Sequence, residues 1–263
     1  MPITLITLTT DFGLTDHFVG AMKGVIAATS PLAHTVDISH CLQKFDILEA
    51  AFFVGEFWKC WPKKTIHVVV VDPGVGSSRR PILLEADGQF FVGPDNGVFT
   101  FVMKDAKKFI TRELTNDKYF HKPVSRTFHA RDIFAPVAAH LAKGVKPMLL
   151  GAKIGDALRL AIPQPERTSR RTFTGTILKI DHFGNLITNF KASDFGAIQT
   201  SPFEMSIGLK TVRHLAIHYA ECDLDELFVI EGSSGYLEVC LNQDSAARKL
   251  GCSSGAPVEL TLF

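Results

Sequence analysis

The chain has 263 residues, of which 46% are hydrophobic and 21% charged, and its 28 Lys and Arg balance 27 Asp and Glu to a net charge of +1. This length suits one large domain or two unequal ones, each able to bury a core. Because the charges balance, no overall field attracts nucleic acid or an acidic membrane, and we expect neither as a partner.

The first sixty residues predict a strand and two helices. A β-branched run predicts a strand over 3–9, followed by a helix capped by Thr15 or Asp16. A second helix is expected over 46–60, where the residues are apolar nearly all round and therefore buried. The short opening run lacks a basic stretch and soon meets Asp11, so we expect no signal peptide. No stretch reaches the roughly 18 apolar residues of a membrane span.

The middle of the chain alternates strand and helix. An unbroken apolar run over 65–71 is typical of a parallel strand covered on both faces. An Asp-Gly turn within 82–93 predicts a hairpin. A further helix is expected over 131–144, opened by Asp132 and closed by Gly144.

These patterns predict two domains of different class. Residues 1–161 are expected to form an α/β domain with a largely parallel sheet. The segment 162–171 is rich in proline and arginine, which predicts an interdomain linker. Short strand-like runs broken by Gly, Asn, Asp and Ser then predict a smaller all-β barrel or sandwich over 172–263.

Several kinds of site are not indicated. The cysteines are odd in number and include no CxxC motif, which fits reduced thiols in a cytoplasmic protein. "DPGVG" is not a phosphate loop, and the dinucleotide pattern GxGxxG is absent. We interpret His214 and His218 as strand residues and expect no bound metal, because no histidine pair has the spacing of metal ligands.

Three aspartates follow strand-like runs: Asp11, Asp72 and Asp95. Taken singly, each is a common turn former, because an Asp side chain bonds the backbone two residues on. In an α/β sheet, however, the loops at the carboxyl ends of the strands form the ligand crevice. Asp11 and Asp72 both occupy such ends, so we expect a shared pocket in which a carboxylate holds the two hydroxyls of a ribose.

Positively charged and imidazole side chains complete this set. One of Arg79 and Arg80 is expected to fold back onto Asp72 and keep its carboxylate ionised, while the other is a surface charge. His129 precedes a helix and is either a structural residue or, beside an Asp–Arg pair, part of a polar set that binds and orients a water molecule.

The second domain contains two further candidates. Asp181, Phe183 and Asn185 offer a carboxylate, a stacking face and an amide within five residues, which suits an adenine, although a turn or bulge also favours Asn and Gly. Ser234 lies in a Gly-rich turn before a strand, where exposed backbone N–H groups can hold a carboxylate or a purine.

Seven motifs occur in order over nearly the whole chain: "TDFG", "FVGAMKG", "HVVVVDPGVG" with a following Arg, "FVGPDNG", "TFHARDIFAPVAAHLA", "DHFGNLITN" and "SGYLE". Together they closely resemble the S-adenosyl-L-methionine (SAM) hydroxide adenosyltransferases, or SAM hydrolases, which are related to fluorinases and chlorinases. The resemblance implies hydrolysis of SAM to adenosine and L-methionine without metal or cofactor. It also implies a homotrimer in which SAM lies between domains of neighbouring subunits.

The resemblance also implies roles for single residues. The implied catalytic residues are Asp72, Arg79 and His129. The implied substrate-binding residues are Asp11 for the ribose diol, Asp181 for the methionine end, Phe183 and Asn185 for adenine, and Ser234 nearby.

Two alternatives are a SAM-dependent halogenase and a non-catalytic SAM- or adenosine-binding protein. The halogenating relatives lack the charged set and carry an aromatic residue where His129 stands. The sequence departs from the hydrolase pattern at two places. Ala130 stands where a glycine is usual, and "NQDSAA" over 242–247 differs from the usual residues there. These departures bear on the reaction rate and the fit of the substrate, and they remove no catalytic group.

Overall fold

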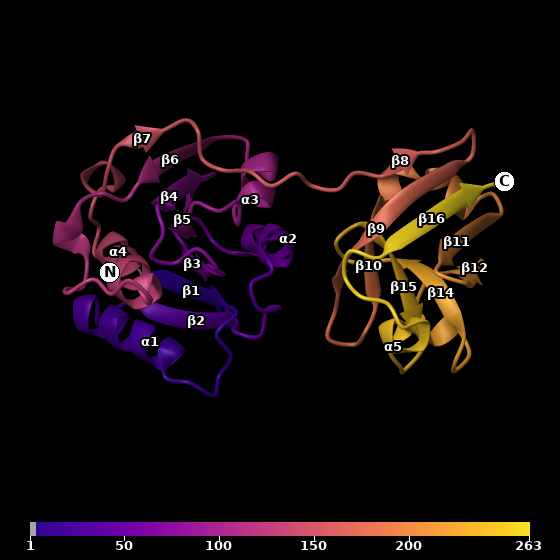
Figure 1. Ribbon diagram of the computed structural model, residues 1–263, viewed down its shortest axis with the longest axis horizontal. Helices are drawn as coiled ribbons and strands as arrows, with labels where there is room; N and C mark the ends of the chain where they lie inside the picture. The colour runs from indigo at the N-terminus through magenta and orange to yellow at the C-terminus, as the bar shows by residue number, and fades with distance from the viewer. Residues whose placement is uncertain (1–3) are drawn as a thin grey trace. The chain divides into compact units, whose positions relative to one another are not determined.

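The computed structural model describes residues 4–263, which divide between Leu160 and Ala161 into two compact units. Each unit has its own sheet (Figure 1), and each packs its buried apolar residues into core clusters of its own. None of the helices within residues 4–263 has the length and apolar character needed to cross a membrane.

The first unit is built on a seven-stranded sheet of order β2-β1-β3-β5-β4-β6-β7. Its strands are β1 (Leu5–Thr10), β2 (His34–Ser39), β3 (Ile66–Val70), β4 (Pro81–Ala86), β5 (Gln89–Pro94), β6 (Phe109–Glu113) and β7 (Lys153–Ile154). The run β2-β1-β3-β5 is parallel, whereas β4, β6 and β7 extend it in antiparallel pairing. The sheet is therefore mixed, with the expected parallel strand β3 inside it; residue 3 of the expected first strand lies outside the described residues.

The expected hairpin is confirmed as β4 and β5. Asp87 and Gly88 between them have φ of 45° and 87°. This left-handed pair matches the right-handed twist of the flanking strands, which explains the Asp-Gly sequence.

Helices cover both faces of this sheet (Figure 1). They are α1 (Phe18–Thr29), α2 (Ile47–Phe57), α3 (Thr100–Asp105) and α4 (Ala135–Ala142), with single 3-10 turns at Trp58–Cys60, Asp117–Tyr119 and Pro147–Leu149. Val68 and Val70 belong to the core shared with α1 and α4, whereas Val69 and Val71 belong to the core shared with α2 and α3. Successive valines of this segment thus pack into two different cores on opposite faces of the sheet, as the unbroken run of valines predicts.

Helix starts differ from expectation at two places. The first helix begins at Phe18 after His17 and has no side-chain cap, so neither Thr15 nor Asp16 caps it. The helix expected over 131–144 begins with a π-helical turn, Ala130–Phe134, and Asp132 lies inside it. Asp132 is fully buried and binds Arg131 and the Ser125 N–H, so it anchors the preceding loop and does not open the helix.

The second unit is a β domain with one short helix, α5 (Ala246–Leu250). Its sheet has the order β12-β11-β16-β9-β10-β15-β14-β13, with β8 paired to β9. The strands are β8 (Glu166–Arg167), β9 (Thr172–Ile180), β10 (Leu186–Lys191), β11 (Phe203–Ile207), β12 (Lys210–Val212), β13 (Leu215–Ala216), β14 (Leu227–Glu231), β15 (Tyr236–Leu241) and β16 (Pro257–Leu262). Three 3-10 turns, Ala192–Asp194, Gly196–Gln199 and Tyr219–Glu221, connect them.

The placement of His214 and His218 in a strand is wrong. The strand β13 has only two residues, Leu215 and Ala216, and the two histidines lie in the irregular segments on either side of it. A ten-residue loop then leads from Ile217 to β14.

Candidate functional site

Asp11 and Asp72 lie at the same edge of the first unit's sheet. The neighbouring parallel strands β1 and β3 pair Thr10 with Val70. Asp11 and Asp72 follow this pair by one and two residues, so both acids come at carboxyl ends of adjacent strands, the position at which α/β sheets bind ligands.

Asp72 forms a two-point ion pair with Arg79. Arg79 Nε donates to Asp72 Oδ1 at 2.9 Å, and Arg79 Nη2 donates to Asp72 Oδ2 at 2.5 Å. The side chain of Asp72 is only 4% exposed, and that of Arg79 is 8% exposed. A planar guanidinium held at two points by a carboxylate has a fixed orientation, which a single contact would not give.

The loop between these residues is folded by tight turns. The Val75 N–H donates to the Asp72 carbonyl at 3.2 Å, and Ser77 bonds the Gly74 carbonyl through both its N–H and its hydroxyl. Gly76 has φ +78°, and a Cβ there would lie 2.1 Å from the carbonyl oxygen of Arg126. Only glycine permits this approach, which brings the loop against the segment leading into His129.

Arg79 also contacts His129. Arg79 Nη2 lies 2.7 Å from His129 Nδ1. Because a guanidinium only donates hydrogen bonds, Nδ1 must be the acceptor, so the imidazole is neutral and carries its proton on Nε2. Partial burial, and then the nearby Arg79 charge, lower the pKa of His129, while Asp72 and Asp132 oppose the shift. The electrostatics therefore favour the neutral imidazole, and the contact with Arg79 selects its tautomer.

One donor of Arg79 is left over. The Nη1 atom is buried and has no hydrogen-bond partner among residues 4–263. The guanidinium carbon lies 5.3 Å from the centre of the Phe134 ring, a cation–π contact with a fully buried aromatic. Arg79 Nη1 is thus a donor without a protein partner, and the tautomer of His129 makes Nε2 a second N–H donor of the set.

Arg80, expected as a surface charge, is instead a structural ion-pair residue. It donates to Asp95 Oδ2 from Nε at 2.9 Å and from Nη2 at 2.6 Å, and to Asp156 Oδ1 at 2.9 Å. Asp95 is 3% exposed and also accepts from the Leu158 N–H. Asp95 therefore has a structural role: it holds the segment that follows β7 in place.

Asp11 is half-buried and has one oxygen committed to the protein. Asp11 Oδ2 accepts from the Phe45 N–H at 2.9 Å. The preceding Thr10 hydroxyl contacts His40 Nδ1 at 2.8 Å and accepts from the Phe12 N–H, which fixes the loop. The second carboxylate oxygen can accept from ligand hydroxyls.

In the second unit, Asp181 organises a turn after β9. Asp181 Oδ1 accepts from the Phe183 and Asn185 N–H groups at 2.9 and 2.8 Å, and Oδ2 accepts from Asn185 Nδ2 at 2.8 Å. The Phe183 ring is left 74% exposed, whereas Asn185 is only 3% exposed. An anchored turn that presents a bare aromatic face is suited to stacking on a flat ring.

Phe183 and Asn185 line a cavity of about 500 Å³. Sequence reasoning missed three of its other lining residues: Tyr219, Asn242 and Arg248. Tyr219 lies in a segment that was expected to be a strand. Asn242 and Arg248 lie in or beside residues 242–247, where the sequence departs from the hydrolase pattern. Ser234 is half-buried in the turn between β14 and β15 and is not among the residues lining this cavity.

An α/β unit with a carboxylate–guanidinium–imidazole set, joined to a β unit with an exposed aromatic turn, defines a two-domain class of small-molecule-binding proteins. Within that class, the chain belongs to the SAM hydroxide adenosyltransferase family. The model of the family's N-terminal domain matches residues 6–151, and that of its C-terminal domain matches residues 175–259. The resemblance drawn from the motifs is confirmed.

Individual relatives agree with this assignment. The (R)-S-adenosyl-L-methionine hydrolase of Salinispora tropica is 34% identical, covering 99% of this chain and 98% of the relative. The protein of that name from Thermus thermophilus is 33% identical, with 95% and 96% covered. A fluorinase of an Actinoplanes species is 27% identical, covering 72% of each chain.

A solved structure has the same fold. The crystal structure of an uncharacterized conserved protein from Thermotoga maritima matches with a TM-score of 0.90 and 33% identity, covering 97% of this chain and 99% of the other.

Proposed function

We propose that this chain hydrolyses S-adenosyl-L-methionine to adenosine and L-methionine. The contact of Arg79 with both Asp72 and His129 carries the proposal, because it fixes the orientation of the guanidinium and makes His129 Nε2 an N–H donor. Membership of the family and the names of the Salinispora and Thermus relatives support it.

The reaction needs a well-placed nucleophile more than an acid. The C5′–S bond breaks as the C5′–O bond forms, and sulfur takes the bonding electrons to leave as the neutral thioether of methionine. The proton of the attacking water passes to solvent. Attack by a hydroxide-like oxygen on a sulfonium cancels charge, so a site that excludes bulk water favours the transition state, and in-line positioning lowers the entropic barrier.

The three residues then have separate roles. Arg79 Nη1 and His129 Nε2–H donate to the attacking oxygen, which lowers the pKa of the water and stabilises developing hydroxide. Asp72 positions Arg79. Replacing any of the three by alanine is expected to reduce the rate on the order of 10²-fold or more; wild-type turnover by all three variants would refute the roles.

Five residues are proposed to bind the substrate: Asp11, Asp181, Phe183, Asn185 and Ser234. Asp11 takes the ribose hydroxyls with its uncommitted oxygen, Phe183 stacks on adenine, and Asn185 reads its edge. Asp181 is proposed to take the methionine ammonium in addition to holding its own turn, with Ser234 nearby.

We further propose that the substrate is the (R) epimer at sulfur. A sulfonium with three different carbon substituents and a lone pair is a stereocentre, and the name of the Salinispora and Thermus relatives specifies (R). A site that aligns C5′, sulfur and water distinguishes the two epimers by where the methyl and methionine arms fall. Separate incubation with each epimer tests this; faster turnover of the (S) form would contradict it.

We also propose a homotrimer with substrate sites at its subunit interfaces, and a chemical step that uses no metal or other cofactor. Sedimentation as a monomer at assay concentration would contradict the trimer. A kcat that falls at saturating SAM after removal of metals by a chelator would contradict the metal-free step.

The deciding experiment is incubation of the purified protein with SAM and separation of the products by chromatography. Hydrolysis predicts adenosine and L-methionine in equal amounts, unchanged by added fluoride or chloride. A halogenated nucleoside would favour the halogenase alternative, and unchanged SAM would favour a binding protein.

A further inference from the structure

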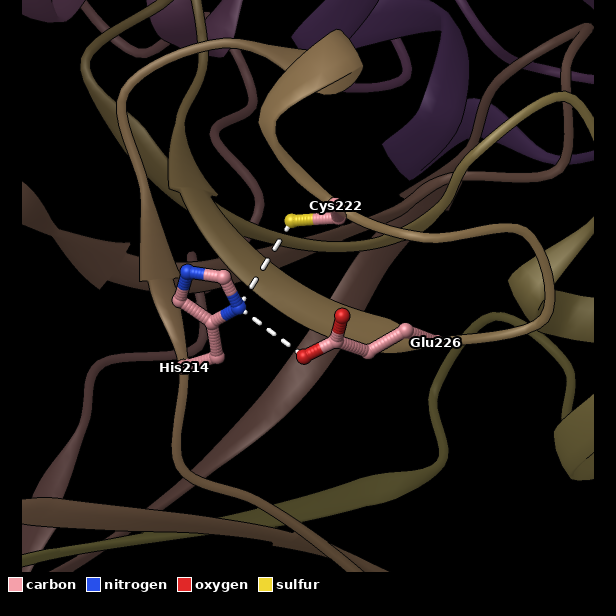
Figure 2. A group of neighbouring side chains, drawn as sticks. All are labelled: His214, Cys222 and Glu226. Atoms are coloured by element: carbon pink, nitrogen blue, oxygen red, sulfur yellow. Dashed lines mark hydrogen bonds and ion pairs between the residues drawn. The ribbon is translucent and has the colours of Figure 1, made fainter.

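We propose that the second unit binds one zinc-class divalent cation through His214 Nδ1, Cys222 Sγ and Glu226 Oε1 (Figure 2). The three ligating atoms lie within 4.8 Å of one another. All three residues lie in the segment between β12 and β14: His214 near its start, Cys222 in the middle and Glu226 at its end. No residue of the proposed catalytic set takes part, so the inference stands apart from the proposed reaction.

Two of the three donor separations, those from His214 Nδ1, are close to the values of tetrahedral coordination. Bond lengths of about 2.3 Å to sulfur and about 2.0–2.1 Å to nitrogen or oxygen place N and S about 3.6 Å apart, and N and O about 3.3 Å apart. The observed separations from His214 Nδ1 are 3.6 Å to Cys222 Sγ and 3.0 Å to Glu226 Oε1. A thiol and a carboxylate thus both approach the nitrogen at which a metal would replace the proton.

The ligand types select the metal. Thiolate, imidazole and carboxylate together suit a borderline cation such as Zn²⁺, whereas Mg²⁺ and Ca²⁺ prefer all-oxygen sites. Three protein ligands leave a fourth position for water. The Glu226 side chain is 41% exposed, so it can shift to close the Sγ–Oε1 distance without disturbing a core.

The surroundings also suit a cation. Metal-ligating histidines usually donate their second N–H to a carboxylate. Here Glu221 Oε1 lies 3.9 Å from His214 Nε2, and Glu221 Oε2 is anchored by the Ile217 N–H at 2.8 Å. A small tightening would complete a carboxylate–histidine–metal arrangement. Glu221, Asp223 and Glu226 place three negative charges beside the buried Cys222.

A metal ion bound to these three residues would fix one wall of the cavity that Phe183 lines. The Cys222 carbonyl accepts from Asn242 Nδ2 at 2.7 Å, and both Asn242 and Tyr219 line that cavity. A metal on Cys222 and on the loop ends would tie this wall to β14 and reduce the freedom of the loop, and its binding energy would add to folding stability.

The test is titration of the chelator-treated full-length protein with Co²⁺, followed by Zn²⁺. We expect one Co²⁺ per chain, a sulfur-to-cobalt charge-transfer absorption band that Zn²⁺ removes, and a higher Tm with Zn²⁺. Cys222→Ser should abolish the band and Glu226→Gln should weaken Zn²⁺ binding at least about tenfold. Cys60→Ser, which removes an exposed thiol of the first unit, should change neither.

Absence of the band in the wild-type protein, or its persistence in Cys222→Ser, would overturn the proposal. Since Cys222 is buried, its variant can fail to fold. Glu226→Gln changes a partly exposed side chain, so Zn²⁺ affinity equal to that of wild type would overturn the proposal on its own.

Discussion

Replacing His129 by alanine and by glutamine separates two roles that an imidazole can have beside a nucleophilic water. As a general base, the ring would take the proton through Nε2. As a donor, it would give Nε2–H to the oxygen. Arg79 decides between them, because its Nη2 lies 2.7 Å from Nδ1 and can only donate. A ring that accepts at Nδ1 already carries its proton at Nε2, so we predict the donor role.

The magnitude follows from the loss of one donor. Removing a single preorganised donor from a developing oxyanion costs on the order of 10²–10³-fold in kcat. His129→Ala removes both the donor and the acceptor for Arg79, so we expect at least the upper part of this range. The amide nitrogen of glutamine reaches the position of Nε2 and can donate but cannot act as a base, so His129→Gln should remain at least about tenfold faster than His129→Ala.

The pH profile supplies a second readout. Burial and the Arg79 charge lower the pKa of His129 below its ordinary value of 6.5. The neutral, active form therefore dominates above this lowered pKa, and kcat/KM should fall as the pH drops through it, with a midpoint below 6.5. His129→Gln should lack this acid limb. Steady-state kinetics across pH checks both points, and a glutamine variant as inactive as the alanine one would refute the donor role.

Three further changes probe the loop, the ribose site and the core. Gly76→Ala should destabilise the fold by more than about 2 kcal/mol and abolish activity, because φ is +78° and the new Cβ would overlap the Arg126 carbonyl. Urea unfolding measures the loss of stability. Gly74→Ala is the control, because its new Cβ would make only ordinary contacts. Asp11→Ala should weaken adenosine binding roughly 10- to 100-fold by calorimetry, the effect of losing hydrogen bonds to a charged acceptor; an unchanged Kd would exclude this ribose role. Burial lowers the pKa of His67 to about 4, so the unfolded state binds a proton that the folded state does not, and roughly 3 kcal/mol of unfolding free energy should be lost between pH 7 and pH 4. His67→Gln should show a correspondingly shallower pH dependence, and equal slopes would contradict this assignment.

Local patterns in the sequence predicted most elements of the first unit. The unbroken valines of β3 indicated burial on both faces, and the Asp-Gly turn indicated the hairpin. Asp46, at the start of the expected second helix, does accept from the Glu49 N–H as its cap. These features succeed because each depends on residues within one or two turns of chain.

Features set by distant contacts were beyond local patterns. Arg80 was interpreted as surface charge because its partner Asp156 lies 76 residues further on. Asp132 resembled a helix cap, yet its carboxylate holds Ser125 inside an extra π-helical turn. The contact between Arg79 and His129 spans 50 residues, so the local pattern left a structural role for His129 as an alternative, and the resemblance to a family favoured the catalytic one.

The metal-ligand group in the second unit shows the same limit. His214, Cys222 and Glu226 match no common ligand spacing, and the very short strand β13 hid the loop that gathers them. A search by spacing alone misses a site in which the ligands flank short strands, because its geometry depends on the fold of the loop.

The most direct test of the central claim is the origin of the new oxygen in the nucleoside product. A single turnover of SAM in H₂¹⁸O, followed by mass spectrometry of the adenosine, should show one ¹⁸O at the 5′ position, and the Asp72→Ala variant should form that product far more slowly. Adenosine without the label would show that water does not attack C5′ and would contradict the proposed mechanism.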